Sequence, residues 1–186
     1  CAAGSHIEMA DGTHKKVENV YKGDRVITVD LLNQNKKYST SIIECVVNTE
    51  CHNGKEKMVV LDNLRITPYH PIIINNKWVF PCDIKEPHEI KCNNMFTFVV
   101  ENKRSVIVDK FPFATYGHNL QGEVISHNYF GTDSVINDLK KIPLYKLGMI
   151  FLRKNMFERG ENGEVNRITF KCDIHNMLHK LYFSNM

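Results

Sequence analysis

Apolar residues in the first 119 positions occur in short stretches that turn residues separate, a pattern that predicts an all-β region. The expected strands are Ile7–Ala10, Val17–Val20, Arg25–Val29, Tyr38–Asn48, Lys57–Leu61, Ile72–Ile74, Trp78–Phe80, Phe96–Glu101 and Ser105–Val108. Asp11-Gly12 and Asn53-Gly54 are typical hairpin turns, and Asn75-Asn76 predicts a third hairpin. Such a chain buries its strands in a sandwich or a closed ribbon fold.

The pattern changes after Asn119 and predicts a short helix. Asp133-Ser134 is expected to cap a helix that runs to Lys140, and Pro143 ends it. The face that this spacing would bury consists of Val135, Ile136 and Leu139. The helical periodicity therefore separates this part of the chain from the preceding β region.

Two further stretches complete the second part of the chain. Leu144–Arg153 is apolar and fits either a helix or a strand, whereas Asp173 is expected to cap a terminal helix. The sequence contains neither a repeat nor a low-complexity linker. We therefore expect residues 120–186 to be an extension that packs on a core of residues 1–119.

Composition narrows the class of protein. The 186 residues carry a formal net charge of +3 that is spread along the chain, which argues against nucleic acid as a partner. No apolar run approaches the length of a membrane span. The six cysteines are irregularly spaced, and their spacing favours reduced thiols in a cytoplasmic protein. We expect a monomer that needs no metal and no cofactor.

The first residue is a candidate nucleophile. The chain begins with Cys1 instead of Met, so its start reflects either cleavage of an upstream segment or an arbitrary cut. The continuous strand and turn over residues 7–12 favour a native segment. The thiol of a cysteine can attack the carbonyl carbon of the preceding residue through a five-membered ring, if a histidine protonates the leaving nitrogen and a hydroxyl orients the peptide.

Two short motifs supply the remaining residue types. Thr67 and His70 stand three positions apart between two expected strands, although a structural turn would explain them equally well. Gly117-His118-Asn119 pairs a histidine with an asparagine whose side-chain amide can cyclise on its own carbonyl. A polar loop is the simpler interpretation of this second motif alone.

Together these residues resemble the hedgehog/intein (Hint) superfamily of autoprocessing domains. Cys1-Ala-Ala-Gly-Ser with the following Met9–Gly12, Val17–Val20 and Gly23–Val26 is similar to the first sequence block of Hint domains, and Thr67-x-x-His70 to the second. Phe96–Glu101, Ser105–Val108 and His118-Asn119 resemble the last block. Four further motifs resemble the Vint group, which occurs in proteins with von Willebrand A domains: Thr67–Pro71, Trp78–Pro81, Thr115–His118 and His127–Thr132. This closer similarity reaches about residue 140, and residues 141–186 match nothing that we can assign.

The resemblance implies an all-β, horseshoe-like Hint fold with pseudo-two-fold symmetry, and an extension with short helices. It also implies that Cys1 forms a thioester with its own upstream segment, assisted by Thr67 and His70. His118 would polarise the carbonyl group of Asn119 if that asparagine cyclised. Leu120 stands where splicing inteins need an acceptor Cys, Ser or Thr, so splicing is not expected and Asn119 should stay intact. Thr40 stands near the place of the Asp that activates sterol in hedgehog domains, so cholesterol transfer is not expected either.

Several alternatives remain at this stage. The chain could be an inactive Hint-fold interaction module, a domain that splices or cleaves at Asn119, or a cysteine hydrolase that acts in trans. Zinc could bind to a second group of residues: Cys82, Asp83, His88 and Cys92. The other thiols, Cys45, Cys51 and Cys172, are expected in the core or on the surface, and His127 either packs near the site or supports a loop.

Overall fold

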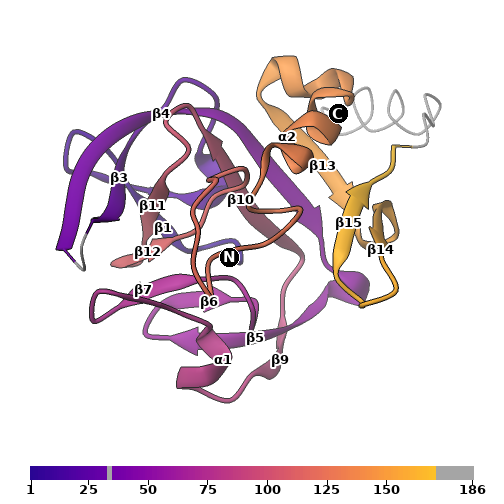
Figure 1. Ribbon diagram of the computed structural model, residues 1–186, viewed down its shortest axis with the longest axis horizontal. Helices are drawn as coiled ribbons and strands as arrows, with labels where there is room; N and C mark the ends of the chain where they lie inside the picture. Colours follow the sequence, from indigo (N-terminus) through magenta and orange to yellow (C-terminus); the bar gives the residue numbers. More distant parts are fainter. Residues whose placement is uncertain (33–34, 171–186) are drawn as a thin grey trace, which may run out of the picture.

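The chain folds mainly into antiparallel strands. A computed structural model describes residues 1–32 and 35–170 (Figure 1). The strands are β1 His6–Glu8, β2 His14–Lys16, β3 Arg25–Leu32, β4 Asn35–Glu50, β5 Lys55–Leu61, β6 Leu64–Ile66, β7 Ile72–Ile74, β8 Lys77–Val79, β9 His88–Lys91, β10 Asn94–Val100, β11 Ser105–Val108, β12 Phe111–Phe113, β13 Met149–Arg153, β14 Phe157–Arg159 and β15 Val165–Ile168. The helices are α1 Pro81–Ile84 and α2 Asp133–Lys140, with 3₁₀ turns η1 Val17–Asn19, η2 His52–Gly54, η3 Pro143–Leu147 and η4 Lys154–Met156.

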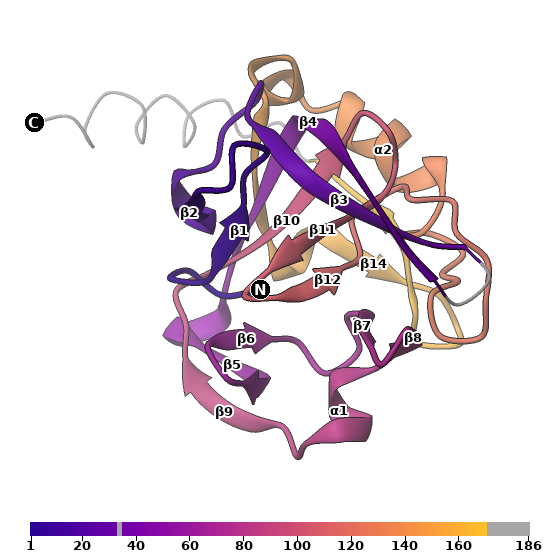
Figure 2. The ribbon, with the colours of Figure 1, turned by 90° about the vertical axis from the view of Figure 1, so that its left-hand side faces the viewer.

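Ten strands form the main sheet, and β4 is its longest member. The order is β10-β4-β3-β11-β12-β7-β8, while β1 pairs with β11 and β2, and β13 pairs with β4. The first half of β4 pairs with β3 and the second half with β10. A second sheet has the order β6-β5-β9, and β14 and β15 form a third. In both views the N-terminus lies between the main sheet and the group of β5, β6, β9 and α1 (Figures 1 and 2).

The expected all-β character of the first part is confirmed, including two of its hairpins. β1 and β2 pair across Asp11-Gly12, and β7 and β8 pair across Asn75-Asn76. The expected strand Val17–Val20 is wrong, because these residues form η1 and end in an extended residue. Val17 and Val20 are both buried, and a spacing of three places them on one side of a 3₁₀ turn.

The hairpin that we expected at Asn53-Gly54 is also wrong. The chain does turn there, at η2, but β4 and β5 do not pair with each other. The second half of β4 already has β10 and β13 as its partners. β5 therefore leaves the main sheet and pairs with β6 and β9.

The second part of the chain contains the expected short helices and also three strands. α2 has the predicted bounds and buries Val135, Ile136 and Leu139, although Thr132 caps it instead of the following Asp-Ser pair. Leu144–Arg153, which fitted helix or strand, divides into η3 and β13. The helix expected from Asp173 lies outside the described residues.

Two apolar clusters dominate the interior. One consists mainly of side chains from strands of the main sheet and includes Cys1, Phe98 and Phe113. The other joins β4 and β10 to α2, β13 and β15, through residues such as Val47, Leu139 and Ile150. No helix within the described residues is long and apolar enough to span a bilayer.

Candidate active site

Cys1 is fixed in the interior by the middle of β10. Its nitrogen donates to Phe96 O at 2.9 Å, and its carbonyl oxygen accepts from Phe96 N at 2.7 Å. The Sγ–H group also points to Phe96 O, at 3.6 Å, and the residue is only 3% exposed. Burial lowers the pKa of the Cys1 amino group from 8.0 to about 5, although the nearby Cys92 and Cys51 thiols raise it. The nitrogen at this position is therefore uncharged at neutral pH, as a peptide nitrogen is.

The Thr67–His70 loop follows β6 and lies against the first residues of the chain. Ala2 N donates to Arg65 O in β6 at 2.9 Å, which connects the N-terminal segment to the strand that leads into the loop. The loop closes on itself, because His70 N donates to Thr67 O at 3.3 Å. Pro68 O accepts from Cys82 N in α1 at 3.1 Å, so the loop is held from both sides.

His70 has a fixed ring orientation and a single favoured charge state. Its Nε2 lies 2.7 Å from Ala114 O, and its ring stacks on Phe113 at a centroid distance of 3.9 Å. Because a carbonyl oxygen only accepts, Nε2 carries the proton and Nδ1 is left as an acceptor. Burial lowers the pKa of His70 to about 3, and the Cys1 amino group and His118 lower it further, against the bond to Ala114 O.

His118 is buried close enough to His70 for electrostatic interaction. Its Nδ1 accepts from Leu120 N at 3.0 Å, which places its proton on Nε2. Burial lowers the pKa of His118 to about 4, and His127 contributes in the same direction. Gly131 packs against the ring, since a Cβ at that position would lie 3.1 Å from His118 Cε1.

Asn119 is exposed, and its neighbours come from both parts of the chain. Its backbone has a left-handed φ of 56°, and its N donates to Gly131 O at 2.7 Å. With the amide oriented so that Oδ1 accepts from Lys103 Nζ at 3.2 Å, Nδ2 donates to Gly131 O at 3.3 Å. Gly117 N likewise donates to Phe130 O at 2.8 Å, so residues 127–131 support the whole motif.

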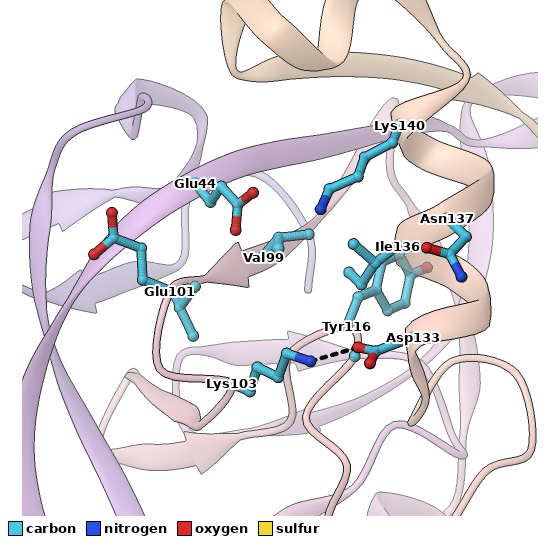
Figure 3. A pocket seen from close by; sticks show the side chains of 11 residues that line it. Glu44, Val99, Glu101, Lys103, Tyr116, Asp133, Ile136, Asn137 and Lys140 are labelled. Carbon is cyan, nitrogen blue, oxygen red and sulfur yellow. Dashed lines mark hydrogen bonds and ion pairs between the residues drawn. The ribbon is translucent and has the colours of Figure 1, made fainter.

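The structure thus gathers some of the candidate residues and separates others. His70 interacts electrostatically with the Cys1 amino group and with His118, and Thr67 lies in the same loop as His70. Asn119 instead contacts Lys103, which lines a polar recess of about 260 Å³ between β10 and α2. Figure 3 shows that recess, with the Lys103–Asp133 ion pair on one wall.

The remaining candidates have structural surroundings. Thr40 is an exposed residue of β4 opposite Ile27 and lies 3.4 Å from an Arg25 nitrogen. His127 Nδ1 accepts from Tyr129 N at 3.1 Å and from Phe130 N at 3.0 Å, so this histidine organises its own loop.

The four proposed zinc ligands are distributed over α1, β9 and the residue after β9. Within the described residues, no group of three or more His, Cys, Asp or Glu side chains could hold a metal ion. Cys92 has a thiol partner instead, Cys51. Cys45 is buried, and burial raises its pKa to about 12, whereas Cys172 lies outside the described residues.

Sequence reasoning missed the two groups that hold the ring of His70. Ala114 acts through its carbonyl oxygen and Phe113 through its ring, and neither function is visible from residue type. Gly117 and Gly131 are residues whose type does indicate their function, since each allows close packing beside His118. A Cβ at Gly117 would lie 2.5 Å from Ile136 Cγ1, so only glycine allows α2 to approach so closely.

The model of the Vint family, described as a Hint domain, matches residues 1–167, beyond the motifs that end near residue 140. The solution structure of a bacterial intein-like domain from Clostridium thermocellum is similar at 15% identity and a TM-score of 0.49, over 61% of this chain and 96% of that one. No curated protein sequence gives a significant match. The chain belongs to the Vint family of Hint domains, a superfamily of self-processing domains.

Proposed function

We propose that this domain cleaves its own precursor through an N-to-S acyl shift at Cys1. The Cys1 sulfur attacks the carbonyl carbon of the preceding residue, and the peptide nitrogen leaves as the Cys1 amine. The upstream segment is then held as a thioester, which water or another nucleophile resolves. The observation that carries this proposal is the position of the Cys1 nitrogen, buried and bonded to Phe96 O.

Phe96 O suits the nitrogen before and after the shift. A peptide N–H at Cys1 donates to this oxygen as the amine does, so the leaving group keeps its partner while the bond breaks. A preorganised acceptor of this kind costs no reorganisation during the reaction. The pKa of about 5 supports this argument, because a buried site that disfavours an ammonium ion is compatible with a neutral peptide nitrogen.

His70 is the proposed proton carrier. Its Nδ1 takes the proton from the Cys1 thiol as the C–S bond forms, and gives it to the nitrogen as the C–N bond breaks. The bond to Ala114 O and the stacking on Phe113 hold the ring in one orientation. Thr67 is proposed to orient the scissile peptide. His118 is proposed to act as a hydrogen-bond donor through its protonated Nε2. General acid–base catalysis by one positioned histidine contributes about 10²–10⁴-fold.

Cleavage or acyl transfer fits this chain better than splicing or sterol attachment. Leu120 has no nucleophile to accept an acyl group. The Asn119 side-chain nitrogen, which would have to attack its own carbonyl, donates to Gly131 O. Thr40 bears no carboxylate that could activate a sterol hydroxyl. The upstream segment is proposed to come from a von Willebrand A-type protein.

A precursor with a short upstream extension tests the proposal. We expect it to release that extension, faster with dithiothreitol or hydroxylamine, and Cys1→Ala to abolish release. Mass spectrometry of the released piece distinguishes a free acid from an adduct, and shows whether the chain stays joined after Asn119. Cys45→Ala is the matched control, because it removes a buried thiol from the other apolar cluster.

His70→Gln is the sharper variant, because glutamine keeps a donor for Ala114 O but lacks a basic nitrogen. We expect release to slow by about 10²–10⁴-fold while circular dichroism stays unchanged. His52→Gln, at an exposed histidine in η2, should cleave at the normal rate. A wild-type precursor that stays intact under thiol would overturn the proposal and favour an inactive interaction module.

A further inference from the structure

Two thiols outside the proposed mechanism lie side by side in the interior. Cys51 Sγ is 3.1 Å from Cys92 Sγ, and the two residues are only 5% and 4% exposed. They share a small apolar cluster with Ala2 and Met58. A separation of 3.1 Å requires little movement to reach the roughly 2.05 Å of a sulfur–sulfur bond.

The pair occupies the junction between two sheets. The β4–β10 ladder ends at Glu50 and Asn94, and the β5–β9 ladder begins at Lys55 and Lys91. Between these ladders, the backbones of the two segments stay bonded. Cys51 N donates to Asn93 O at 2.8 Å, and Cys92 N donates to Gly54 O at 2.9 Å. The backbone therefore holds both cysteines in place on either side of the sulfur contact.

The junction also supports the N-terminal segment. Ala2 forms a bridge with Met95 in β10 and donates to Arg65 O in β6. Its side chain packs in the same cluster as the two thiols. The junction thus connects the sheet that binds Cys1 with the strands that lead to the Thr67–His70 loop.

The geometry points to a disulfide between Cys51 and Cys92, formed by exchange with a small oxidised disulfide such as oxidised glutathione. The Cys92 thiolate attacks one sulfur of the oxidant and releases one thiolate. The Cys51 thiolate then attacks the Cys92 sulfur and releases the second. Two protein thiols lose two electrons and two protons, and the oxidant becomes two thiols. Cys1 takes no part.

The ionisation of the pair supports this order of attack. The hydrogen bond that the Cys51 thiol donates lowers the pKa of Cys92 to about 7, against its burial, and the Cys1 amino group and Arg65 lower it as well. The same contact and burial raise the pKa of Cys51. Cys92 is therefore the sulfur that supplies a thiolate at neutral pH.

Redox titration of the chain of 186 residues tests the inference without any cleavage reaction. The protein is equilibrated with glutathione buffers of increasing oxidised fraction, blocked with N-ethylmaleimide and digested with trypsin. Cleavage after Lys55 and Lys91 places Cys51 and Cys92 in different peptides, so a linked pair is found by its mass. Cys45 shares the peptide of residues 38–55 with Cys51, so fragmentation of the linked pair then shows which of the two is bonded and which carries N-ethylmaleimide. We expect one link, Cys51–Cys92, and a rise in melting temperature of roughly 5–15 °C on oxidation.

Variants make the outcome specific. Cys51→Ala and Cys92→Ala should lose both the link and the temperature shift, while Cys45→Ala should keep both. A native chain whose first link involves Cys1 or Cys82 would overturn the inference, as would a chain that forms no link at any ratio. The glutathione ratio at half-oxidation also tests the expectation of reduced, cytoplasmic thiols.

Discussion

At the residue scale, the site is defined by groups that are kept neutral. The Cys1 amine and the rings of His70 and His118 are each buried, and burial is the main reason that their pKa values are lowered to about 5, 3 and 4. A neutral imidazole is what a proton carrier needs before the thiol loses its proton. The same burial makes the folded state sensitive to acid.

Acidification should therefore destabilise the chain before its carboxylates titrate. The unfolded chain takes up protons on its amino group near pH 8.0 and on its histidines near pH 6.5, but the folded chain does not. Stability is present above these values and decreases as pH falls toward the folded pKa values. We expect the urea midpoint to decline steadily from pH 8 to pH 5. His118→Gln should flatten the decline, whereas His52→Gln should leave its slope unchanged; equal slopes for both variants would contradict the argument.

At the element scale, α2 and the loop before it hold the His118-Asn119 motif. Residues 127–131 accept backbone hydrogen bonds from Gly117 and Asn119, and α2 packs on Gly117 through Ile136. The ring of Tyr116 stacks on Phe130 at 5.0 Å, with only 6° between the planes. Residues beyond 119 therefore determine where His118 lies.

Gly117→Ala should separate α2 from the core. The new Cβ would lie 2.5 Å from Ile136 Cγ1 at a φ of +66°, so it adds a clash to the cost of a left-handed alanine. Gly12→Ala is the matched control, since its φ of +84° is similar but no atom lies within 4 Å. We expect a loss of about 1 kcal/mol at Gly12 and about 2–4 kcal/mol at Gly117. If chemical denaturation gave equal losses of unfolding free energy for the two variants, the prediction would be wrong, because α2 would then move away from the new Cβ at no energetic cost.

At the scale of the whole molecule, the main sheet extends past the core that the sequence predicts over residues 1–119. β13 adds to β4 as a parallel neighbour, and Leu139 and Ile150 complete the second apolar cluster. Tyr145 Oη also donates to Glu44 in β4 at 2.8 Å.

Truncation tests this arrangement. A chain that ends at Asn119 would expose the side of β4 and β10 that carries Val47 and Val99, so we expect it to aggregate or to bind hydrophobic dyes. A chain that ends at residue 170 keeps every contact described above and should melt cooperatively. A stable, monomeric fragment of residues 1–119 would contradict the prediction.

The sequence predicts those features of the fold whose geometry depends on residues close together in the chain. The turns at Asp11-Gly12 and Asn75-Asn76 and the apolar face of α2 could be predicted because their geometry is set within a few residues. The pairing of β4 could not be predicted, because its partners β3, β10 and β13 come from different parts of the chain. The order of Cys1, Thr67, His70 and His118 was visible in the sequence. The acceptor at Ala114 and the contact between Cys51 and Cys92 arise only from packing.

The bond between Cys1 and Phe96 spans 95 positions, so a precursor that cleaves as proposed is expected to react only after translation has passed β10. The nucleophile leaves the ribosome first but has no binding site until β10 has followed it, and His70 has no acceptor until Ala114 emerges. Domains that precede Cys1 have by then had time to fold, because N-terminal domains fold first at about 5–20 residues per second. A precursor that cleaves as proposed would therefore release its upstream segment after that segment has had time to fold.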